Sequence, residues 1–262
     1  MVKEQFDIFI LAGQSNAEGR GVGTSPEQYV PRDDIYSLNA NICVVDTGRG
    51  LDITYPDSTF VLKKAEEEIA DKNEQVSNFA LSFAQKYVEK GFLESGRKVL
   101  IIRAAVCGTG FAKGHWGKDD ILFRKMLEMT DYALQLNPTN RLLGLLWHQG
   151  EHDAVEGNRP ENFHQQLKTL FSIVRARYEC PNLPIIAGDF CHDWKNKNLE
   201  ICNPIVEEIQ SVIEEMGNAA FVESDGLLSN NQSAGNGDDI HFCRDSLHIL
   251  GKRYFEAYQK LR

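Results

Sequence analysis

The hydrophobic pattern of this chain begins with a nearly continuous apolar run close to the amino terminus. Six of the seven residues from Phe6 to Ala12 are apolar, too continuous a run for a strand with one face in water. The run predicts a strand that is buried on both faces of a parallel sheet. Gly13 ends it, and residues 14–16 are small or polar, which predicts a tight turn. Ser15 would then lie at the carboxyl edge of the sheet, where open α/β sheets bind their ligands.

Apolar runs and helical patterns alternate along the rest of the chain. The further strands that we expect are 98–106, 141–147, 183–187 and 219–223. The helices that we expect are 78–91, 120–136, 160–178, 204–216 and 244–261. Asn78 is suited to cap the first helix, and Gly91 to end it. Alternation without linkers or repeats predicts a single domain over residues 1–262, a three-layer α/β/α sandwich with a parallel sheet.

The stretch from Arg20 to Asp57 departs from both periodicities and is rich in Gly, Pro, Asp and Thr. One strand-like patch, 42–45, lies inside it, so we expect an extended loop with a small hairpin near the carboxyl edge of the sheet. Long loops in compact domains often carry function, and this one is expected to shape a substrate pocket. Residues 63–74 form a charge-mixed run, which predicts a solvated helical face or a flexible loop.

Composition and charge exclude several classes of function. A net charge of −10 over 262 residues disfavours nucleic acid and anionic membrane as partners. No apolar run approaches the roughly 20 residues of a membrane helix. The first strand follows residues 1–3 directly, so we expect no signal peptide and a cytoplasmic protein, or a secreted one if a leader has been removed. The six cysteines form no CxxC pair and are expected to be reduced, mostly structural thiols.

Three short blocks carry the candidate chemistry: GQSN at 13–16, WHQGE at 147–151 and DDIHF at 238–242. A serine hydroxyl such as that of Ser15 is a poor nucleophile unless a base removes its proton. His241 is a suitable base, because imidazole titrates near neutral pH. Asp238, three residues earlier, is suited to orient the imidazole, although the adjacent Asp239 is an alternative. The simpler interpretation is an ordinary turn at Ser15 and a surface histidine at position 241.

These blocks, in this order, resemble the sialate O-acetylesterase-like proteins, which include the acetylxylan esterases of carbohydrate esterase family 6. Those proteins belong to the wider SGNH hydrolases. The resemblance spans nearly the whole chain and implies a flavodoxin-like α/β/α fold. It also implies a catalytic triad of Ser15, His241 and Asp238. The family usually has glycine where this chain has Asp239, and that difference makes the choice of aspartate ambiguous.

An ester carbonyl under attack develops negative charge, which requires hydrogen-bond donors already in place. The candidates are the N–H groups of Ser15 and Gly108 and the side-chain amide of Gln149, because all three follow the carboxyl ends of expected strands. The block around Gly108 matches the family only loosely. Glu151 is expected to orient Gln149 or the turn at Ser15, and a solvated loop carboxylate is the alternative. The residues expected to support the site from behind are Gln14, Asn16 and Glu151.

Two further patterns indicate other chemistry. Residues 148–152 fit the H-x-x-E-H pattern of zinc proteases, which requires both histidines on one helical face. They follow an expected strand and include Gly150, so we expect neither a helix nor a zinc site there. The glycines at 108–110 follow a strand, but no helix pattern opens directly after them, as a dinucleotide-binding turn would require. No metal or cofactor is therefore implied.

The expected function is that of a serine esterase that removes acetyl or other short acyl groups from a carbohydrate through an acyl-enzyme. A lipase- or thioesterase-like SGNH hydrolase with a longer acyl pocket is the alternative with the same chemistry. A non-catalytic carbohydrate-binding module on the same fold is the alternative of a different class. Labelling by a fluorophosphonate separates the binding module from the two hydrolases, because it requires an activated serine. The expected partner is an acetylated carbohydrate.

Overall fold

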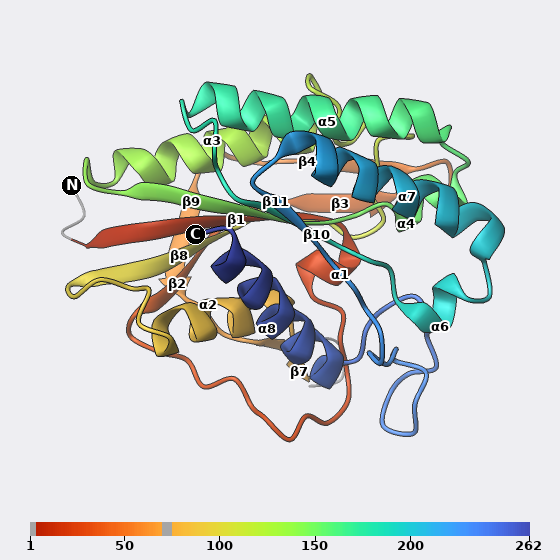
Figure 1. The fold of residues 1–262 in the computed structure, drawn as a ribbon, viewed down its shortest axis with the longest axis horizontal. Coiled ribbons are helices and arrows are strands. Elements are labelled where there is room, and N and C mark those ends of the chain that lie inside the picture. Colours follow the sequence, from red (N-terminus) through yellow and green to blue (C-terminus); the bar gives the residue numbers. More distant parts are fainter. Residues whose placement is uncertain (1–3, 70–74) are drawn as a thin grey trace.

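A computed structural model describes residues 4–69 and 75–262, whose centre is a seven-stranded sheet (Figure 1). Its strand order is β11-β10-β9-β1-β8-β2-β5. The strands are β1 Gln5–Gly13, β2 Ile35–Ala40, β5 Phe60–Lys64, β8 Arg97–Arg103, β9 Arg141–His148, β10 Ile185–Gly188 and β11 Ala219–Val222. All neighbours in this sheet pair in parallel except β2 and β5, which are antiparallel. The predicted sheet is confirmed as a mostly parallel one with β1 at its centre.

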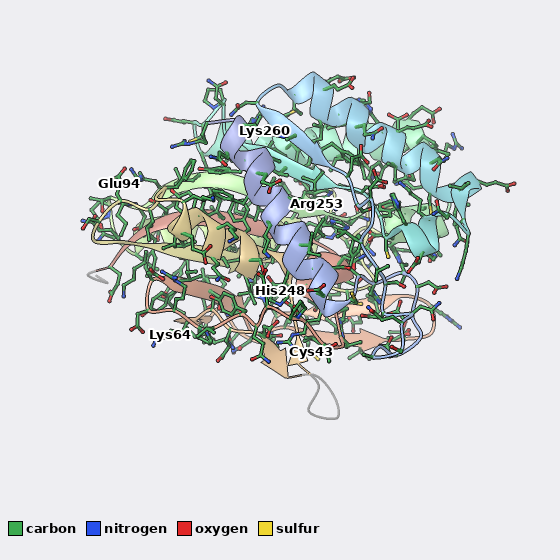
Figure 2. All side chains as sticks on the ribbon, turned by 60° about the horizontal axis from the view of Figure 1, so that its bottom comes forward. Cys43, Lys64, Glu94, His248, Arg253 and Lys260 are labelled. Atoms are coloured by element: carbon green, nitrogen blue, oxygen red, sulfur yellow. The ribbon has the colours of Figure 1, made fainter. Side chains whose placement is uncertain are left out.

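Helices cover both faces of the sheet (Figure 1). The long helices are α2 Phe79–Glu89, α3 Ile121–Gln135, α5 Pro160–Arg177, α7 Leu199–Met216 and α8 Arg244–Lys260. Helices α3, α5 and α7 share one hydrophobic core with the sheet, and α2 and α8 share the other. Figure 2 shows His248 near the beginning of α8 and Lys260 at its far end. The predicted three-layer α/β/α architecture is thereby confirmed.

Strand β1 is buried on both faces, as its continuous apolar run predicts. Ile8 and Ile10 belong to the core beneath α3, α5 and α7, whereas Phe9 and Leu11 belong to the core beneath α2 and α8. Asp7, the polar exception, is also fully buried, where two arginine side chains and a tyrosine hydroxyl hydrogen-bond its carboxylate. Because both faces of this central strand are buried, its carboxyl end has little freedom to move.

The stretch Arg20–Asp57, expected to be a long loop, contains strand β2 of the main sheet, and in this respect the prediction was wrong. Strand β2 pairs with β8, and β5, which begins just after the stretch, pairs with β2 and forms the edge of the sheet. Both are short, and β5 has no buried side chain, so neither carries a clear apolar alternation. The predicted hairpin does form, as β3 Cys43–Asp46 and β4 Leu51–Thr54.

The charge-mixed run at 63–74 is not helical where it is described. It begins inside β5, and its later part includes β6 Glu68–Ile69, which pairs with β7 Gln75–Val76. Residues 70–74 of the run lie outside the described residues. The helix predicted from position 204 begins earlier, at Leu199, so Pro204 lies inside α7 rather than in its first turn. Buried Cys202 shows that the apolar face of α7 extends upstream of the proline.

The other predicted helices lie within a few residues of their expected bounds. The side chain of Asn78 caps α2 by accepting a hydrogen bond from the N–H of Ala80, as predicted. Across residues 4–69 and 75–262, no helix combines the length and the apolar character needed to cross a bilayer.

Candidate active site

The turn after β1 is held tightly against the neighbouring strand β9. Gly13 has a φ of +131°, and a Cβ at this position would lie 2.1 Å from the carbonyl oxygen of His148. The N–H of Gln14 donates to that same oxygen at 3.0 Å. Helix α1 (Ser15–Glu18) follows, and Ser15 itself is buried. Glycine is therefore required at position 13, and the position of Ser15 is fixed by backbone contacts.

The loop before α8 brings an aspartate against the candidate base. The Nδ1 of His241 and the Oδ2 of Asp238 lie 2.5 Å apart. The other carboxylate oxygen of Asp238 accepts the N–H groups of Ile240 and His241 at 2.9 and 3.1 Å. Asp239 instead forms an ion pair with Lys197 at 2.5 Å. The structure therefore places Asp238, and not Asp239, beside the imidazole.

Opposing effects determine the pKa values of His241 and Asp238. Burial lowers the pKa of His241, but hydrogen bonds and charge interactions with Asp238 and Cys107 outweigh it and raise the pKa to about 9. Burial raises the pKa of Asp238, yet the same hydrogen bond and charge of His241 bring it below its ordinary value. Cys107, which was grouped above with the structural thiols, thus lies against His241 and also interacts with Arg20.

Asn16 connects the three sequence blocks. Its side-chain nitrogen donates to Glu151 Oε1 at 2.8 Å and to the carbonyl oxygen of Ile240 at 3.1 Å. Its side-chain oxygen accepts the N–H of Phe242 at 3.0 Å. The two backbone contacts flank His241 on either side. Glu151 is fully buried, so the alternative of a solvated loop carboxylate is wrong.

Gln149 lies in the same interior and donates its side-chain amide to Asp153 at 2.5 Å. Its nitrogen is also 3.4 Å from the Oε1 of Gln14. Asp153 is fully buried and accepts the N–H groups of Phe111 and Ala112 at 2.9 and 2.8 Å. The sequence reasoning missed Asp153, although it follows Gln149 by four residues, the spacing that faces a neighbour on a helix. Through these hydrogen bonds Asp153 connects the loop after β8 to helix α4 (Glu151–Val155).

Gly108 lies in that loop with a φ of +70° and lines a pocket of about 760 Å³. The hairpin β3–β4 forms one wall of this pocket, which agrees with the expectation that the long loop shapes it. Polar side chains prevail on the other walls. The charged and imidazole side chains that line the pocket are Arg20, Asp46, Arg49, Lys113, His115, His152 and Glu156.

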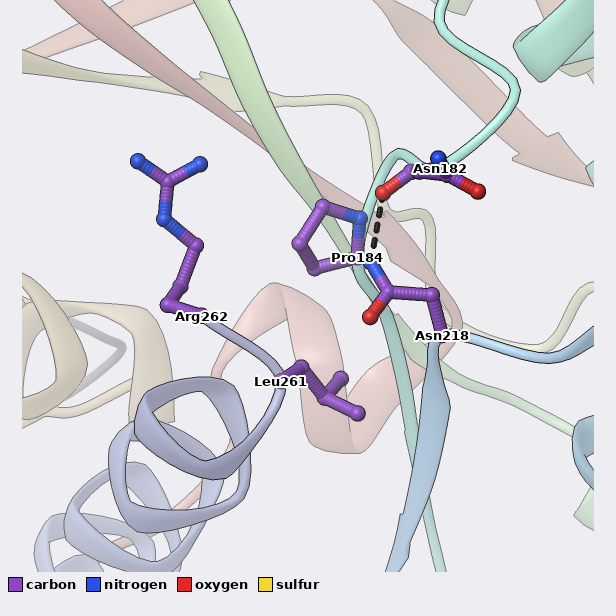
Figure 3. A pocket seen from close by; sticks show the side chains of 5 residues that line it. All are labelled: Asn182, Pro184, Asn218, Leu261 and Arg262. Carbon is purple, nitrogen blue, oxygen red and sulfur yellow. Dashed lines mark hydrogen bonds between the residues drawn. The ribbon is translucent and has the colours of Figure 1, made fainter.

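Another cavity, of about 500 Å³, lies at the opposite edge of the sheet (Figure 3). Pro184 and Asn218, which directly precede β10 and β11, line it together with the end of the chain at Leu261 and Arg262. Ser15 follows the carboxyl end of β1, so this cavity lies away from the candidate site.

The H-x-x-E-H pattern divides between a strand and a helix. His148 ends β9, where its Nδ1 lies 3.0 Å from the hydroxyl of Tyr254, and α4 begins only at Glu151. The expectation that no helix forms here was wrong for the second half of the pattern. Gly150, with a φ of +146°, makes the turn from strand to helix. In the described part of the chain, no three acidic, histidine or cysteine side chains are grouped to hold a metal ion.

Asn230 is a further residue that sequence reasoning did not find. Its side-chain oxygen accepts the N–H of Val22 at 3.0 Å, and its nitrogen donates to the carbonyl oxygen of Arg20 at 2.9 Å. The same nitrogen lies 3.4 Å from Asp238 Oδ2, and the N–H of Asn230 donates to the carbonyl oxygen of His241 at 2.8 Å. An asparagine in a polar loop gives no signal of such contacts in advance.

Comparison with known proteins agrees with this geometry. Residues 5–260 match the family described as carbohydrate esterase, sialic acid-specific acetylesterase. The chain belongs to this family. Two curated relatives match parts of it. A probable 9-O-acetyl-N-acetylneuraminic acid deacetylase of Escherichia coli (strain K12) is 26% identical over 139 residues, 44% of this chain and 42% of that protein. A probable carbohydrate esterase of Arabidopsis thaliana is 23% identical over 192 residues, 68% of this chain and 66% of that protein.

The chain therefore spans about two fifths to two thirds of the length of these curated relatives. Solved structures align over more of the chain. The crystal structure of NanS superposes with a TM-score of 0.77 at 20% identity, covering 99% of this chain and 98% of that one. A carbohydrate acetylesterase from Xanthomonas citri gives a TM-score of 0.65 at 15% identity, covering 97% of this chain and 56% of that one. At these identities the likeness establishes the shared fold of the family.

Proposed function

We propose that this member of the family is a serine esterase that removes acetyl or other short acyl groups from a carbohydrate. The observation that supports it most is the short hydrogen bond between His241 and Asp238, in a loop that Asn16 joins to the turn carrying Ser15. A nucleophile, a base and the group that orients the base come from the two ends of the chain. Membership in a carbohydrate esterase family supports the same chemistry.

In the proposed reaction, the Oγ of Ser15 attacks the ester carbonyl carbon while the Nε2 of His241 accepts the hydroxyl proton. Asp238 holds Nδ1, so Nε2 is the nitrogen left for catalysis. His241 then passes the proton to the departing sugar oxygen, and an acetyl-enzyme remains on Ser15. A water molecule, deprotonated by His241, attacks that ester and releases acetate and the free serine.

The negative charge on the tetrahedral intermediate requires donors that are already in place. We assign this role to the N–H groups of Ser15 and Gly108 and to the side chain of Gln149. Ser15 is the first residue of α1, so its N–H has no partner inside the helix, which supports the assignment of Ser15. The Gln149 nitrogen has two hydrogens, of which Asp153 takes one at 2.5 Å. The other has only long contacts, of 3.4 Å, to Gln14 Oε1 and to the carbonyl oxygen of Thr109.

We further propose that the sugar is acidic, as an O-acetylated sialic acid is. Arg20, Arg49 and Lys113 line the pocket beside Gly108. Glu18 pairs with the first of these arginines and Glu156 with the lysine, whereas no ion pair of Arg49 is found among the described residues. An unpaired guanidinium suits a carboxylate ligand. One relative is itself named as a 9-O-acetyl-N-acetylneuraminic acid deacetylase.

The proposal is tested by fluorophosphonate labelling together with a series of nitrophenyl esters, acetylated sialic acid and acetylated xylan. We expect labelling of the wild type, none of Ser15→Ala, and a fall in turnover of roughly 10⁶ in that variant. Ser15→Ala should fold normally, because a small side chain is exchanged for another in a turn. A wild-type protein that resists the label but binds sugar would instead be a binding module. Faster turnover of octanoyl than of acetyl esters would indicate the lipase-like alternative.

A further inference from the structure

Two histidines of the pocket have no role in the proposed reaction. His115 lies in the loop after β8, and His152 lies in α4, which follows β9. Both line the pocket of about 760 Å³ beside Gly108. Their ring centroids are 6.1 Å apart, with an angle of 49° between the ring planes. Two imidazoles from separate loops therefore form one part of the pocket wall.

The hydrogen bonds of His115 define its tautomer. The residue is only 6% exposed, and its Nδ1 accepts the N–H of Gly110 at 3.2 Å. Burial and the neighbouring His152 lower the pKa of His115, so the ring is neutral at pH 7 and carries its hydrogen on Nε2. The described residues provide no partner for that N–H group. It is a donor on a nearly buried side chain that faces the pocket.

His152 adds a second nitrogen without a partner. Its backbone N–H donates to Gln14 Oε1 at 3.1 Å, which fixes the residue relative to the turn at Ser15. Its Nε2 is closed off from solvent and has no hydrogen-bond partner among the described residues. Buried polar groups in native proteins nearly always have partners, so this unpaired nitrogen on a residue of the pocket wall requires an explanation. A polar ligand seated against both rings supplies one.

We propose that His115 and His152 form the sub-site that hydrogen-bonds the hydroxyl groups of the sugar and thereby selects carbohydrate esters over simple ones. This inference rests on the proposed esterase function of the same pocket. The N–H of His115 that has no partner suits a hydroxyl oxygen of a sugar, and the ring nitrogens of His152 add hydrogen-bonding capacity beside it. The pocket volume is within the range of sites that enclose a small ligand, and it leaves room for a sugar beyond the acetyl group.

The decisive experiment compares His115→Asn with His115→Gln. In the asparagine variant the amide oxygen can replace Nδ1 and keep the contact with Gly110, but the donor toward the pocket is lost. In the glutamine variant the amide nitrogen can reach the position of Nε2, but the contact with Gly110 is lost. The measurement is the ratio of kcat/KM for 9-O-acetyl-N-acetylneuraminic acid to kcat/KM for nitrophenyl acetate.

We expect His115→Asn to lower this ratio by about tenfold, mostly through KM for the sugar, as loss of one ligand hydrogen bond does. His115→Gln should recover at least half of that loss on a logarithmic scale. His152→Phe, which keeps a ring but removes both nitrogens, should lower the ratio in the same direction. An unchanged ratio in His115→Asn, or an equal fall in the asparagine and glutamine variants, would overturn the sub-site.

Calorimetric binding of N-acetylneuraminic acid separates this inference from the proposed function. Binding needs no turnover, and we expect His115→Asn to weaken it by about tenfold. If the wild type hydrolyses no ester but binds the sugar through His115, the esterase proposal fails and the sub-site remains. If the wild type is an active esterase whose sugar binding is indifferent to His115, the sub-site is wrong and the esterase proposal remains.

Discussion

Neutralising Asp238 tests the proposed catalytic machinery most directly. Asp238→Asn keeps the size of the side chain but removes the charge that His241 contacts at 2.5 Å. The asparagine can also present its N–H₂ group to Nδ1, which would favour the wrong tautomer of the imidazole. Loss of the orienting carboxylate in a triad lowers turnover by about 10⁴. We expect a fall of that size in the plateau rate.

The pH dependence follows from the raised pKa of His241. A base with a pKa of about 9 is mostly protonated at pH 7, so the wild-type rate should rise by roughly a hundredfold between pH 7 and pH 10. Asp238→Asn removes the hydrogen bond and the charge that oppose the effect of burial. The midpoint of the pH profile should therefore move to lower pH in this variant, while its plateau falls.

The same interaction contributes to the stability of the fold. Raising the pKa of His241 from 6.5 to about 9 corresponds to roughly 3 kcal/mol, at about 1.4 kcal/mol for each pH unit. A raised histidine pKa stabilises the folded state fully below pH 6.5, and this contribution is lost as the pH rises through 9. The melting temperature of the wild type should thus exceed that of Asp238→Asn at pH 6 by more than it does at pH 10.

The assay is kcat/KM for nitrophenyl acetate from pH 5 to pH 10, with Asp239→Asn as the matched control. That control removes the ion pair of Asp239 with the exposed Lys197 and its hydrogen bond with Asn231, neither of which involves His241, so it should cost less than about tenfold. NMR titration of His241 measures the pKa independently of the rate. The reasoning is refuted if Asp239→Asn loses more kcat/KM than Asp238→Asn does, or if the pKa of His241 is the same in Asp238→Asn as in the wild type.

Three other predictions follow from the contacts around Ser15. Asn16→Ala removes three hydrogen bonds, which should lower the free energy of unfolding by roughly 3 kcal/mol and reduce kcat. Thermal melting measures the first effect, and Asn41→Ala, whose contacts are exposed, should show no comparable loss. Gly13→Ala should cost roughly 4 kcal/mol or abolish folding, whereas Gly91→Ala, also at positive φ but with open space around it, should cost about 1 kcal/mol by denaturant titration. Exhaustive chelation of metal ions should leave the esterase rate unchanged, and His152→Ala should lower that rate far less than His241→Ala does. A rate that is lost on chelation and restored by added zinc would contradict both expectations.

The central strand was predictable because its burial on both faces gives the sequence a local pattern, a nearly continuous apolar run. A run buried on both faces is expected to be apolar, and β1 is apolar from Phe6 to Ala12 at every position but Asp7. Strands β2 and β5 lack this signature, because β5 lies at the sheet edge without a buried side chain and β2 leaves half of its side chains partly exposed. The place of β2 in the sheet depends on pairing with β8, and that of β5 on pairing with β2, which no local pattern records.

The candidate site was predictable only in part for a similar reason. Asp238 precedes His241 by three residues, so one turn brings them together, and spacing alone indicates the contact. Cys107 reaches the same loop from a distant part of the chain, and Asn230 connects that loop to the distant Arg20 and Val22. Tertiary folding creates those contacts, and neither residue type carries a signal for them.

The bonds of Asn16 to Ile240 and Phe242 span 224 and 226 positions of the chain. The entropic cost of bringing two chain positions together rises with the length between them, and contacts of such range form late in folding. The sheet can pair before the 238–242 loop docks, because β1 makes its ladders with β8 and β9. During refolding, secondary structure should thus recover ahead of enzymatic activity. The recovery of enzymatic activity therefore measures when the 238–242 loop docks against the turn at Ser15.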